Sequence, residues 1–503
     1  MKNQTRRSFI KHSTLTTAVA ATGLMSIGAI SQAHTPNITP NNKSYQFARQ
    51  IPVDDILYDL VVAGGGPAGA AAAICASRLG AKVLLIEAMG CLGGMSTSGY
   101  VCAFDPMANG ERMLVGGFMK EIVETLYSRG FMGPGINPDS WRKNYHVWSP
   151  FQPEGLKIIF DEKLVEAGVN VLFFTKVIGA DTSNGVVNGV VISNVEGLKY
   201  VQAKKFIDAT GDAVLSDICG VKYREAGRDT DRIMPATLAS LFSGMDWSKP
   251  GLHTQSPEGV KLIEQEFEAG NFFQCDRHLV GISKIGHTVG YLNGGHIFNQ
   301  NVVKVDSLTQ GMMTGRKVVQ ECQAFLRKYS ENCKNMELVS TAPVMGVRES
   351  RRIEGEYELS FDDLMNKRQF PDQIGVFNKF VDIHPYDCTK EEHERFLREK
   401  DKTGRLGRGD MFGIPYSILV PKGGWKNLWV AGRCSSSDVM AHGSIRVQPS
   451  CSMLGQAAGT AAVQSIKTGQ PANDLDTEML VKTLREAGAY LPQTSLSKKM
   501  TRV

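Results

Sequence analysis

Long apolar runs and closely spaced metal or redox ligands are scarce in this chain. Nothing after residue 33 approaches 18 consecutive apolar residues, so we expect no stable membrane insertion. The ten cysteines include no C-x-x-C pair, which excludes a dithiol redox centre, a c-type haem and a ferredoxin-type cluster. No H-x-x-x-H or comparable spacing appears, so no metal site is indicated. We expect scattered buried thiols, with at most one disulfide.

Positive charge is in excess only at the N-terminus. The formal net charge is +5, and Lys2, Arg6, Arg7 and Lys11 carry four of these charges, which leaves the rest of the chain near +1. A basic surface able to attract nucleic acid or an anionic membrane is therefore not indicated, and we expect no nucleic-acid partner.

The first 33 residues have the pattern of an export signal. Residues 5–11 contain the pair Arg6-Arg7 and resemble a twin-arginine signal, and a moderately apolar stretch follows at 15–30. Ser31-Gln32-Ala33 resembles a small-residue cleavage site. We therefore predict a signal peptide at 1–33 that binds the twin-arginine translocase, a polar, flexible lead-in at 34–55, and a periplasmic or secreted mature protein.

Residues 59–87 have the pattern of a strand–helix–strand unit. Residues 60–63 form a short apolar run typical of a buried parallel strand. Residues 70–78 are rich in alanine and favour a helix, and residues 82–86 are a second apolar run.

Three glycines follow the first strand of this unit at G-x-G-x-x-G spacing. Gly64 allows a tight turn, Gly66 lets the backbone approach a pyrophosphate, and Gly69 allows close packing of helix on strand. The helix N-terminus offers free N–H groups to phosphates, and Glu87 ends the second strand where it can bind a ribose hydroxyl. The unit predicts a dinucleotide site; a glycine-rich turn without a ligand is the alternative.

Further elements follow along the chain. We expect a helix at 154–167, a hairpin of 187–192 with 199–203, a strand at 206–208 that ends in a glycine-containing turn, a strand at 428–430 and a small-residue helix at 453–465. Residues 222–345 mix strand and helix signals without a nucleotide signature, and we assign them to a second domain.

Four segments, at 64–99, 207–213, 346–353 and 430–459, carry motifs that together resemble one family. This is the family of FAD-dependent oxidoreductases that sits beside the fumarate reductase and succinate dehydrogenase flavoproteins. Many FAD and NAD proteins share the first motif, whereas the third and fourth are more particular to this family.

The resemblance implies a fold of the α/β class with an FAD domain that is discontinuous in sequence. That domain would be doubly wound, Rossmann-like and of the glutathione-reductase type, with parts at 56–221 and 405–475. An α+β substrate domain at 222–404 would be inserted between them, and 476–503 would be a C-terminal tail.

The resemblance also implies a set of FAD contacts. Glu87 would hold the adenosine ribose, Asp212 would lie near the pyrophosphate or ribityl chain, and the helix containing Gly455 would point its N-terminus at the flavin pyrimidine edge. The loop at 93–99 would pass under the isoalloxazine ring, and a covalent flavin link to the adjacent Cys91 is an alternative that the family pattern does not demand. The implied cofactor-binding residues are Gly64, Gly66, Gly69, Glu87, Gly94, Thr97, Asp212, Gly432 and Gly455.

Two residues of the last motif are our candidates for catalysis. His442 suits proton transfer near neutral pH, and Arg446 suits holding a carboxylate or stabilising an enolate-like charge. The alternative for Arg446 is a structural pairing with an FAD phosphate or a core carboxylate.

Two other groups of residues have weaker functional signals. Arg348, Glu349, Arg351 and Arg352 form a dense charged cluster, in which Arg348 and Arg352 share a face if the segment is helical. We expect it to be a surface ion-pair network. His287 and His296 are candidates for lining a substrate cleft, although a structural role is the commoner one for isolated histidines.

The expected activity is hydride transfer between a small organic substrate and flavin. A second G-x-G-x-x-G motif is absent and export removes the protein from the NAD(P)H pool, so electrons would pass to or from a separate redox partner, a quinone, a small acceptor or oxygen. Oxidation of an alcohol or sugar-derived hydroxyl and reduction of an activated C=C bond both fit; relatives often accompany polysaccharide breakdown. A flavin-dependent isomerase or eliminase and a non-catalytic flavin-binding protein are the alternatives.

Overall fold

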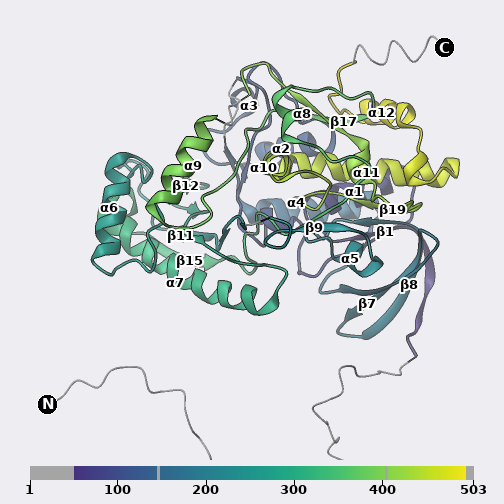
Figure 1. The fold of residues 1–503 in the computed structure, drawn as a ribbon, viewed down its shortest axis with the longest axis horizontal. Helices are drawn as coiled ribbons and strands as arrows, with labels where there is room; N and C mark the ends of the chain where they lie inside the picture. The colour runs from purple at the N-terminus through teal and green to yellow at the C-terminus, as the bar shows by residue number, and fades with distance from the viewer. Residues whose placement is uncertain (1–49, 144–147, 231, 403–405, 494–503) are drawn as a thin grey trace, which may run out of the picture. The chain divides into compact units, whose positions relative to one another are not determined.

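A mixed sheet that carries helices on its faces organises the chain (Figure 1). The computed structural model describes residues 50–493 except 144–147, 231 and 403–405. The predicted signal peptide and residues 34–49 lie outside these ranges. Within them, no helix combines the length and the apolarity that a bilayer crossing requires.

The sheet has seven strands, and its central strand is the one that precedes the glycine motif. The strand order is β5-β2-β1-β8-β7-β6, with β19 also paired to β8. β1 lies parallel between β2 and β8, and residues 60–63 are fully buried, as expected for an apolar run covered on both faces. The strands are β1 (Val53–Ala63), β2 (Val83–Ile86), β5 (Asn170–Leu172), β6 (Lys176–Ser183), β7 (Val186–Asn194), β8 (Gly197–Asp208) and β19 (Leu428–Val430).

The parallel strands and their covering helices agree with the predicted Rossmann-like α/β class; the glutathione-reductase subtype stays a prediction. The strand–helix–strand unit, the hairpin and the strand at 428–430 are confirmed. The predicted strands at 199–203 and 206–208 are instead one strand, β8, which pairs antiparallel with β7 along residues 197–202 and parallel with β1 along residues 200–208. No glycine or proline interrupts residues 198–208, so the strand continues through both predicted segments.

Two helices with small side chains, α1 (Pro67–Arg78) and α11 (Gln448–Thr468), pack together with their backbones in contact. A Cβ atom at Gly455 would lie 1.9 Å from the carbonyl oxygen of Ala68, and one at Gly459 would lie 2.4 Å from that of Ala72. α4 (Pro153–Ala167) and α2 (Gly117–Ser128) also contribute to this core. The predicted helices at 154–167 and 453–465 are thus confirmed.

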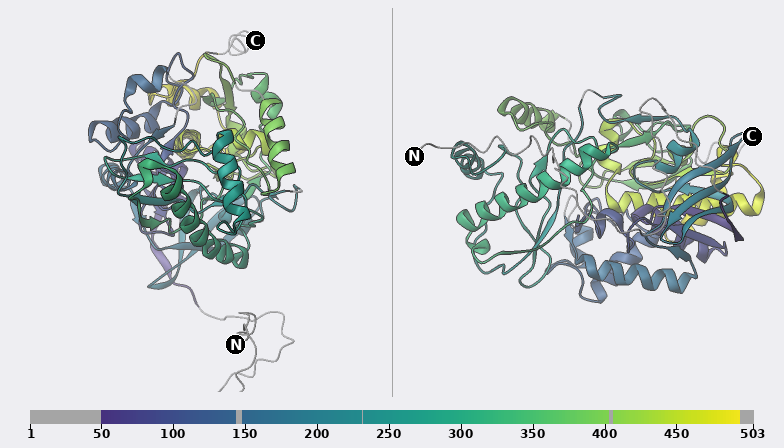
Figure 2. Two further views of the ribbon diagram at one scale, coloured as in Figure 1. Left: turned by 90° about the vertical axis from the view of Figure 1, so that its left-hand side faces the viewer. Right: turned by 90° about the horizontal axis from the view of Figure 1, so that it is seen from below.

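A second group of elements builds separate apolar cores. It contains α6 (Pro257–Glu268), α7 (Val305–Tyr329) and a small sheet of order β12-β13-β11-β15, and it stands apart from α11 in Figure 1 and in the right-hand view of Figure 2. These strands are β12 (Ser283–Lys284), β13 (Gly290–Leu292), β11 (Ser240–Ser243) and β15 (Glu337–Thr341).

Part of the predicted substrate domain returns to the first core. Leu359, Leu364 and Phe377 are buried with α1 and α11, and β17 (Gln373–Phe377) pairs with β18 (Phe412–Pro415). The elements that connect these parts are α3 (Pro138–Lys143), α5 (Val214–Cys219), α8 (Phe361–Met365), α9 (Lys390–Lys402), α10 (Val439–Ile445), β3 (Ala103–Phe104), β4 (Ser149–Pro150), β9 (Tyr223–Glu225), β10 (Ala236–Thr237), β14 (His296–Ile297), β16 (Arg351–Ile353) and four short 3-10 turns at Gly94–Ser96, Glu331–Cys333, Tyr416–Leu419 and Ala472–Asp474.

The described chain has regular structure at both ends, including part of the lead-in that the sequence predicted to be flexible. β1 begins at Val53, inside the segment predicted as a lead-in. The predicted C-terminal tail contains α12 (Thr477–Glu486), which buries Leu480 and Leu484 against the first core. All ten cysteines lie in described ranges and are free thiols, eight of them buried.

The contact between α1 and α11 predicts a stability effect. Gly455→Ala places a methyl group against the Ala68 backbone, which cannot move aside as a flexible side chain would, so the free energy of unfolding should fall by about 1–3 kcal/mol or more. Urea unfolding measures the change. Gly281→Ala, whose Cβ would meet nothing nearer than 3.8 Å, is the control and should unfold like the parent protein. Equal stability of the two variants would contradict the packing argument.

Candidate functional site

A cavity of about 800 Å³ lies at the carboxyl ends of the parallel strands, where ligands bind in open α/β sheets. β1 leads into Gly64, β2 into Glu87, and β19 into Gly432. Residues 344–348 and 379–384 form the opposite part of the wall. Within the described ranges, no group of three or more His, Cys, Asp or Glu residues could hold a metal ion.

The structure brings most of the predicted binding residues to this cavity. Among the predicted site residues, those that line the cavity are Gly64, Gly66, Glu87, Gly94, Asp212, Gly432 and Arg446. Gly69, Thr97, Gly455 and His442 are not among the lining residues, and neither is Cys91, the alternative site of a covalent link.

Glycines 64, 66 and 69 serve different purposes. Gly64 has a φ of +94°, which only glycine adopts readily. A Cβ at Gly66 would meet nothing within 4 Å, so this position is open to the cavity at the start of α1. A Cβ at Gly69 would lie 1.7 Å from the carbonyl oxygen of Gly64, so Gly69 allows the close packing that the spacing predicted. The packing of Gly455 on α1 likewise accounts for that glycine.

Glu87 is held rigidly at the cavity wall. Its carboxylate accepts hydrogen bonds from the backbone N–H groups of Gly65, at 2.5 Å, and Met89, at 2.7 Å. Burial raises the pKa of Glu87, while these two hydrogen bonds act in the opposite direction. The carboxylate is therefore fixed where it can accept a further hydrogen bond from a ligand.

Thr97 shapes its loop rather than the cavity. It is fully buried, and its Oγ1 donates a hydrogen bond of 2.5 Å to the carbonyl oxygen of Leu92. Gly94, at φ +49°, brings the same loop against α1, because a Cβ there would lie 3.1 Å from the Cα atom of Gly66.

The segment 348–352 is buried except for the partly exposed Arg351, which corrects the predicted surface ion-pair network. Residues 351–353 form strand β16, so Arg348 and Arg352 do not share a helical face. The side chains of Arg352 and Glu349 are 1% and 0% exposed and form an ion pair of 2.8 Å. The segment tolerates burial because its charged groups find partners inside the protein.

Arg348 differs from Arg352 because it lacks a carboxylate partner. It lines the cavity, and its Nη1 donates to the carbonyl oxygen of Pro235, at 2.8 Å, and to Thr237 Oγ1, at 2.7 Å. No carboxylate of the described chain lies within ion-pair distance of Arg348. Burial and the nearby charge of Arg446 lower the pKa of Arg348 to about 10, so it stays a cation at neutral pH.

His442 is buried behind this arginine. Its Nε2 lies 3.0 Å from the carbonyl oxygen of Arg348, and its side chain does not line the cavity. Burial, followed by the charges of Arg352 and Arg446, lowers the pKa of His442 well below its usual range. This placement gives a neutral imidazole that supports the backbone of Arg348, and it offers no route for the proton transfer expected from the sequence.

Arg446 reaches the cavity between α10 and α11. Its Nη2 donates to Asp382, to the backbone oxygen at 3.0 Å and to Oδ2 at 3.2 Å. Nε is buried and has no hydrogen-bond partner in the described chain. Burial alone would raise the pKa of Asp382, but the charges of Lys379 and Arg446 lower it, so the carboxylate is ionised.

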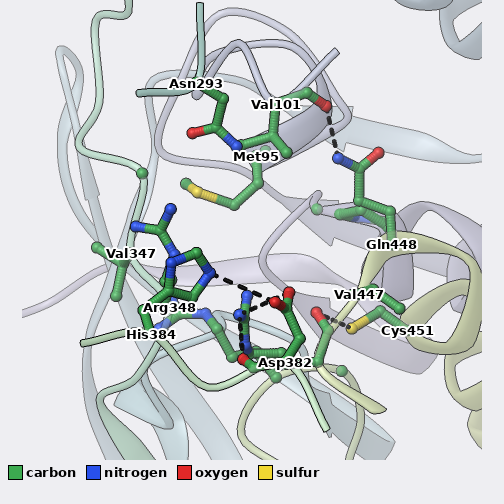
Figure 3. A pocket seen from close by; sticks show the side chains of 18 of the residues that line it. Met95, Val101, Asn293, Val347, Arg348, Asp382, His384, Val447, Gln448 and Cys451 are labelled. Carbon is green, nitrogen blue, oxygen red and sulfur yellow. Dashed lines mark hydrogen bonds and ion pairs between the residues drawn. The ribbon is translucent and has the colours of Figure 1, made fainter. Parts of the chain in front are cut away.

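His384 is the functional candidate that sequence reasoning missed. Figure 3 shows it beside Arg348 and Asp382 in the cavity wall. Its Nδ1 lies 2.9 Å from His296 Nε2, and its Nε2 lies 3.5 Å from Asp382 Oδ1. Burial and then the charge of Arg348 lower the pKa of His384 well below its usual range, so the ring is neutral.

The only hint of this site in the sequence is that Asp382 and His384 are two residues apart, which places both on one side of an extended segment. His296, one of the two cleft candidates, lies behind His384 and does not line the cavity, and His287 is exposed.

Lys379 and Asp105 form a further buried ion pair that lines the cavity. Their side chains are 1% and 7% exposed, Lys379 binds Asp105 Oδ2, and Oδ1 has no hydrogen-bond partner in the described chain. The cavity wall thus contains a buried, charged region.

Comparisons with known proteins identify a family. A family model described as FAD dependent oxidoreductase matches residues 59–486. Among solved structures the chain is similar to a geranylgeranyl bacteriochlorophyll reductase-like protein from Thermoplasma acidophilum, at 13% identity, 86% coverage of this chain and 84% of that one, and a TM-score of 0.44. It is also similar to a flavoprotein/dehydrogenase from Cytophaga hutchinsonii, at 14% identity, 86% and 83% coverage, and a TM-score of 0.40. Likenesses this distant carry no argument about activity. No curated protein matches the chain.

The buried ion pair of Lys379 and Asp105 predicts that substitutions of these two residues have coupled effects on the free energy of unfolding. Lys379→Met leaves the Asp105 carboxylate buried without its cation, so the free energy of unfolding should fall by about 3–5 kcal/mol. Adding Asp105→Asn should restore part of the loss, because it removes the unpaired charge. Urea unfolding of the two single variants and the double variant measures this. Lys204→Met, which breaks the exposed pair with Asp59, is the control and should cost less than about 1 kcal/mol. Additive losses in the double variant would contradict a buried pair.

Proposed function

Because the chain belongs to the family of FAD-dependent oxidoreductases, we propose that it oxidises a hydroxyl group of a small organic substrate by transferring a hydride to FAD. The protein is an enzyme of this class and FAD is its cofactor. The direction and the type of substrate rest on one observation, the neutral imidazole of His384 in a cavity wall that also holds charged groups.

The residues at the sheet end of the cavity fit FAD. Gly66 leaves open space at the start of α1, where no side chain caps the helix, so the first N–H groups can bind a pyrophosphate. Glu87 is fixed where it can bind a ribose hydroxyl, and Gly94 lines the cavity beside Gly66. Asp212, which accepts a hydrogen bond of 2.8 Å from Arg433, lines the same region.

The N-terminus of α11 supports placing the flavin ring nearby. Val447, Gln448 and Cys451, at the start of this helix, line the cavity. No side chain caps the helix, so its positive end can stabilise negative charge on a ligand. The resemblance implied that the N-terminus of the helix containing Gly455 points at the flavin pyrimidine edge. We assign that role to residues 447–451 at the start of α11.

At the other end of the cavity, His384 and Arg348 would act on the substrate. His384 Nε2 would accept the hydroxyl proton while the carbon gives up its hydride, and bound FAD supplies the two-electron acceptor. Arg348 has Nη1 fixed by two neutral acceptors, so its remaining N–H groups can bind the substrate oxygen as it gains negative charge.

Two parts of the proposal rest on the sequence, and the substrate class rests on the cavity lining. The twin-arginine pattern supports export to the periplasm or beyond the cell, and the single dinucleotide motif supports a separate electron acceptor such as a quinone, a redox partner or oxygen. A sugar-derived alcohol is the substrate class proposed for the screen, since polar and charged groups converge on the substrate end.

Absorbance spectroscopy tests the proposal first. The purified protein should be yellow, acid precipitation should release the colour, and a polyol or sugar should bleach it under anaerobic conditions. Colour retained in the pellet would mean a covalent link. A folded, colourless protein, or a flavin that no alcohol reduces, would contradict the proposed function.

The role of His384 gives a further prediction. His384→Gln keeps a hydrogen-bonding side chain but removes the base, so substrate should reduce the flavin about 100-fold more slowly, or slower still, with FAD content unchanged. Stopped-flow absorbance measures the rate. His287→Gln, at an exposed histidine, is the matched control and should reduce its flavin at the parent rate. An unchanged rate in His384→Gln would remove this residue from the mechanism.

A further inference from the structure

We infer that His384, His296 and Asp276 form a buried proton relay that fixes the tautomer of His384 and receives the substrate proton. This inference rests on the proposed function, because it assigns the groups behind the proposed base. His384 touches the cavity, whereas His296 and Asp276 act through it and are positioning residues.

The three side chains are in direct contact and largely hidden from solvent. Asp276 Oδ1 lies 3.0 Å from His296 Nδ1, and His296 Nε2 lies 2.9 Å from His384 Nδ1. The exposed fractions are 7%, 2% and 9% for Asp276, His296 and His384. Only His384 lines the cavity, so the chain of contacts runs from the cavity wall into the second group of elements.

Asp276 is held in the form that only accepts hydrogen bonds. Its carboxylate also receives the backbone N–H groups of His296, at 2.9 Å, and His278, at 3.1 Å. Burial acts to raise its pKa, but the charge and hydrogen bonds of His296 outweigh burial, and the pKa of Asp276 falls well below its usual range. An ionised, rigid carboxylate therefore stands at the inner end of the relay.

This carboxylate determines where the protons lie. An ionised carboxylate can only accept, so His296 must carry its proton on Nδ1. When His296 carries only this proton, its Nε2 is an acceptor and takes the proton that His384 carries on Nδ1. The remaining nitrogen of His384, Nε2, is left with a free lone pair, which is the form that a base requires.

The same contacts can receive the proton once the substrate releases it. In the oxidation, the substrate O–H bond would break and its proton would bind His384 Nε2, while bound FAD would supply the acceptor for the hydride that leaves the carbon. The protonated Nε2 then faces Asp382 Oδ1 at 3.5 Å, and the Nδ1 proton can move to His296, whose own Nδ1 proton is shared with Asp276. Carboxylates at both ends thus stabilise the added positive charge.

Several other charged or titratable groups surround the relay. Arg348 opposes protonation of His384, and Asp382, which is itself bound by Arg446 and near Lys379, favours it. The ring of His278 packs 5.7 Å from that of His296 and 5.5 Å from that of His384, and it is neutral because burial lowers its pKa to about 3. The positive charge of Lys400 also lowers the pKa of His278. Asp276 is the carboxylate in contact with His296.

The pH dependence of flavin reduction tests the relay. Flavin reduction requires unprotonated His384, and the negative charge of Asp276 favours the protonated form of the His384–His296 pair. Asp276→Asn should therefore move the acidic limb of the profile to lower pH by about 1 unit, and the plateau rate should fall roughly tenfold because the base is weaker. Single-turnover reduction of the holoenzyme by the best substrate of the screen measures both.

A second variant and a matched control complete the test. His296→Gln interrupts the relay and should shift the limb in the same direction, and the double variant should lose no more than either single variant. Asp246→Asn, at an exposed carboxylate of the second group that bonds only to Ser248 in its own turn, should leave the profile unchanged.

An unmoved limb in both relay variants, or losses that multiply in the double variant, would overturn the relay. FAD content and melting temperature are measured for each variant, so that a folding defect is recognised. If His384→Gln is slow while the relay variants have normal profiles, the relay fails and the proposed function stands; if His384→Gln is itself unaffected, the proposed function fails.

Discussion

The backbone contact between α1 and α11 is the constraint on which the rest of the site depends. Gly455 and Gly459 let the two helices approach so closely that any side chain at these positions would meet backbone carbonyl groups. Both helices begin at the same cavity, one after Gly66 and the other after Val447, without a capping side chain. The fold therefore directs two positive helix ends toward one cavity, although Gly455 and Gly459 do not line it themselves.

Charge compensation governs the opposite end of the cavity. A low-dielectric interior penalises an unpaired ion, and most of the ions here have a counter-charge, as Arg352 has Glu349 and Lys379 has Asp105. The side chain of Arg348 is hydrogen-bonded only to neutral oxygens, and burial together with the charge of Arg348 keeps the neighbouring His384 neutral. A cation without a carboxylate in direct contact can thus attract a negative oxygen, and it contributes to the protonation state of the adjacent imidazole.

Sequence reasoning was sufficient where local pattern decides structure. The run at 60–63, the three glycines and the end of the next strand lie in one short unit, so their spacing alone predicts the turn and the binding edge. It failed where distant segments meet. The cluster at 348–352 has the composition of a surface, and only the contacts with Pro235, Thr237 and Ser437 explain its burial. His442 belongs to a motif yet faces the core, whereas His384 gains its partners from a residue 88 positions earlier, which no periodicity can reveal.

The ten free thiols acquire a consequence if the protein leaves the cytoplasm as proposed. Eight are buried, and burial raises the pKa of Cys75 to about 12, so the folded chain holds almost no thiolate there to attack an oxidant. An unfolded chain in an oxidising compartment would expose all ten and could join them in many wrong combinations. The order of events would then matter more than the final stability: acquisition of the fold must precede exposure to the oxidant, and a translocation route that carries folded cargo satisfies that order.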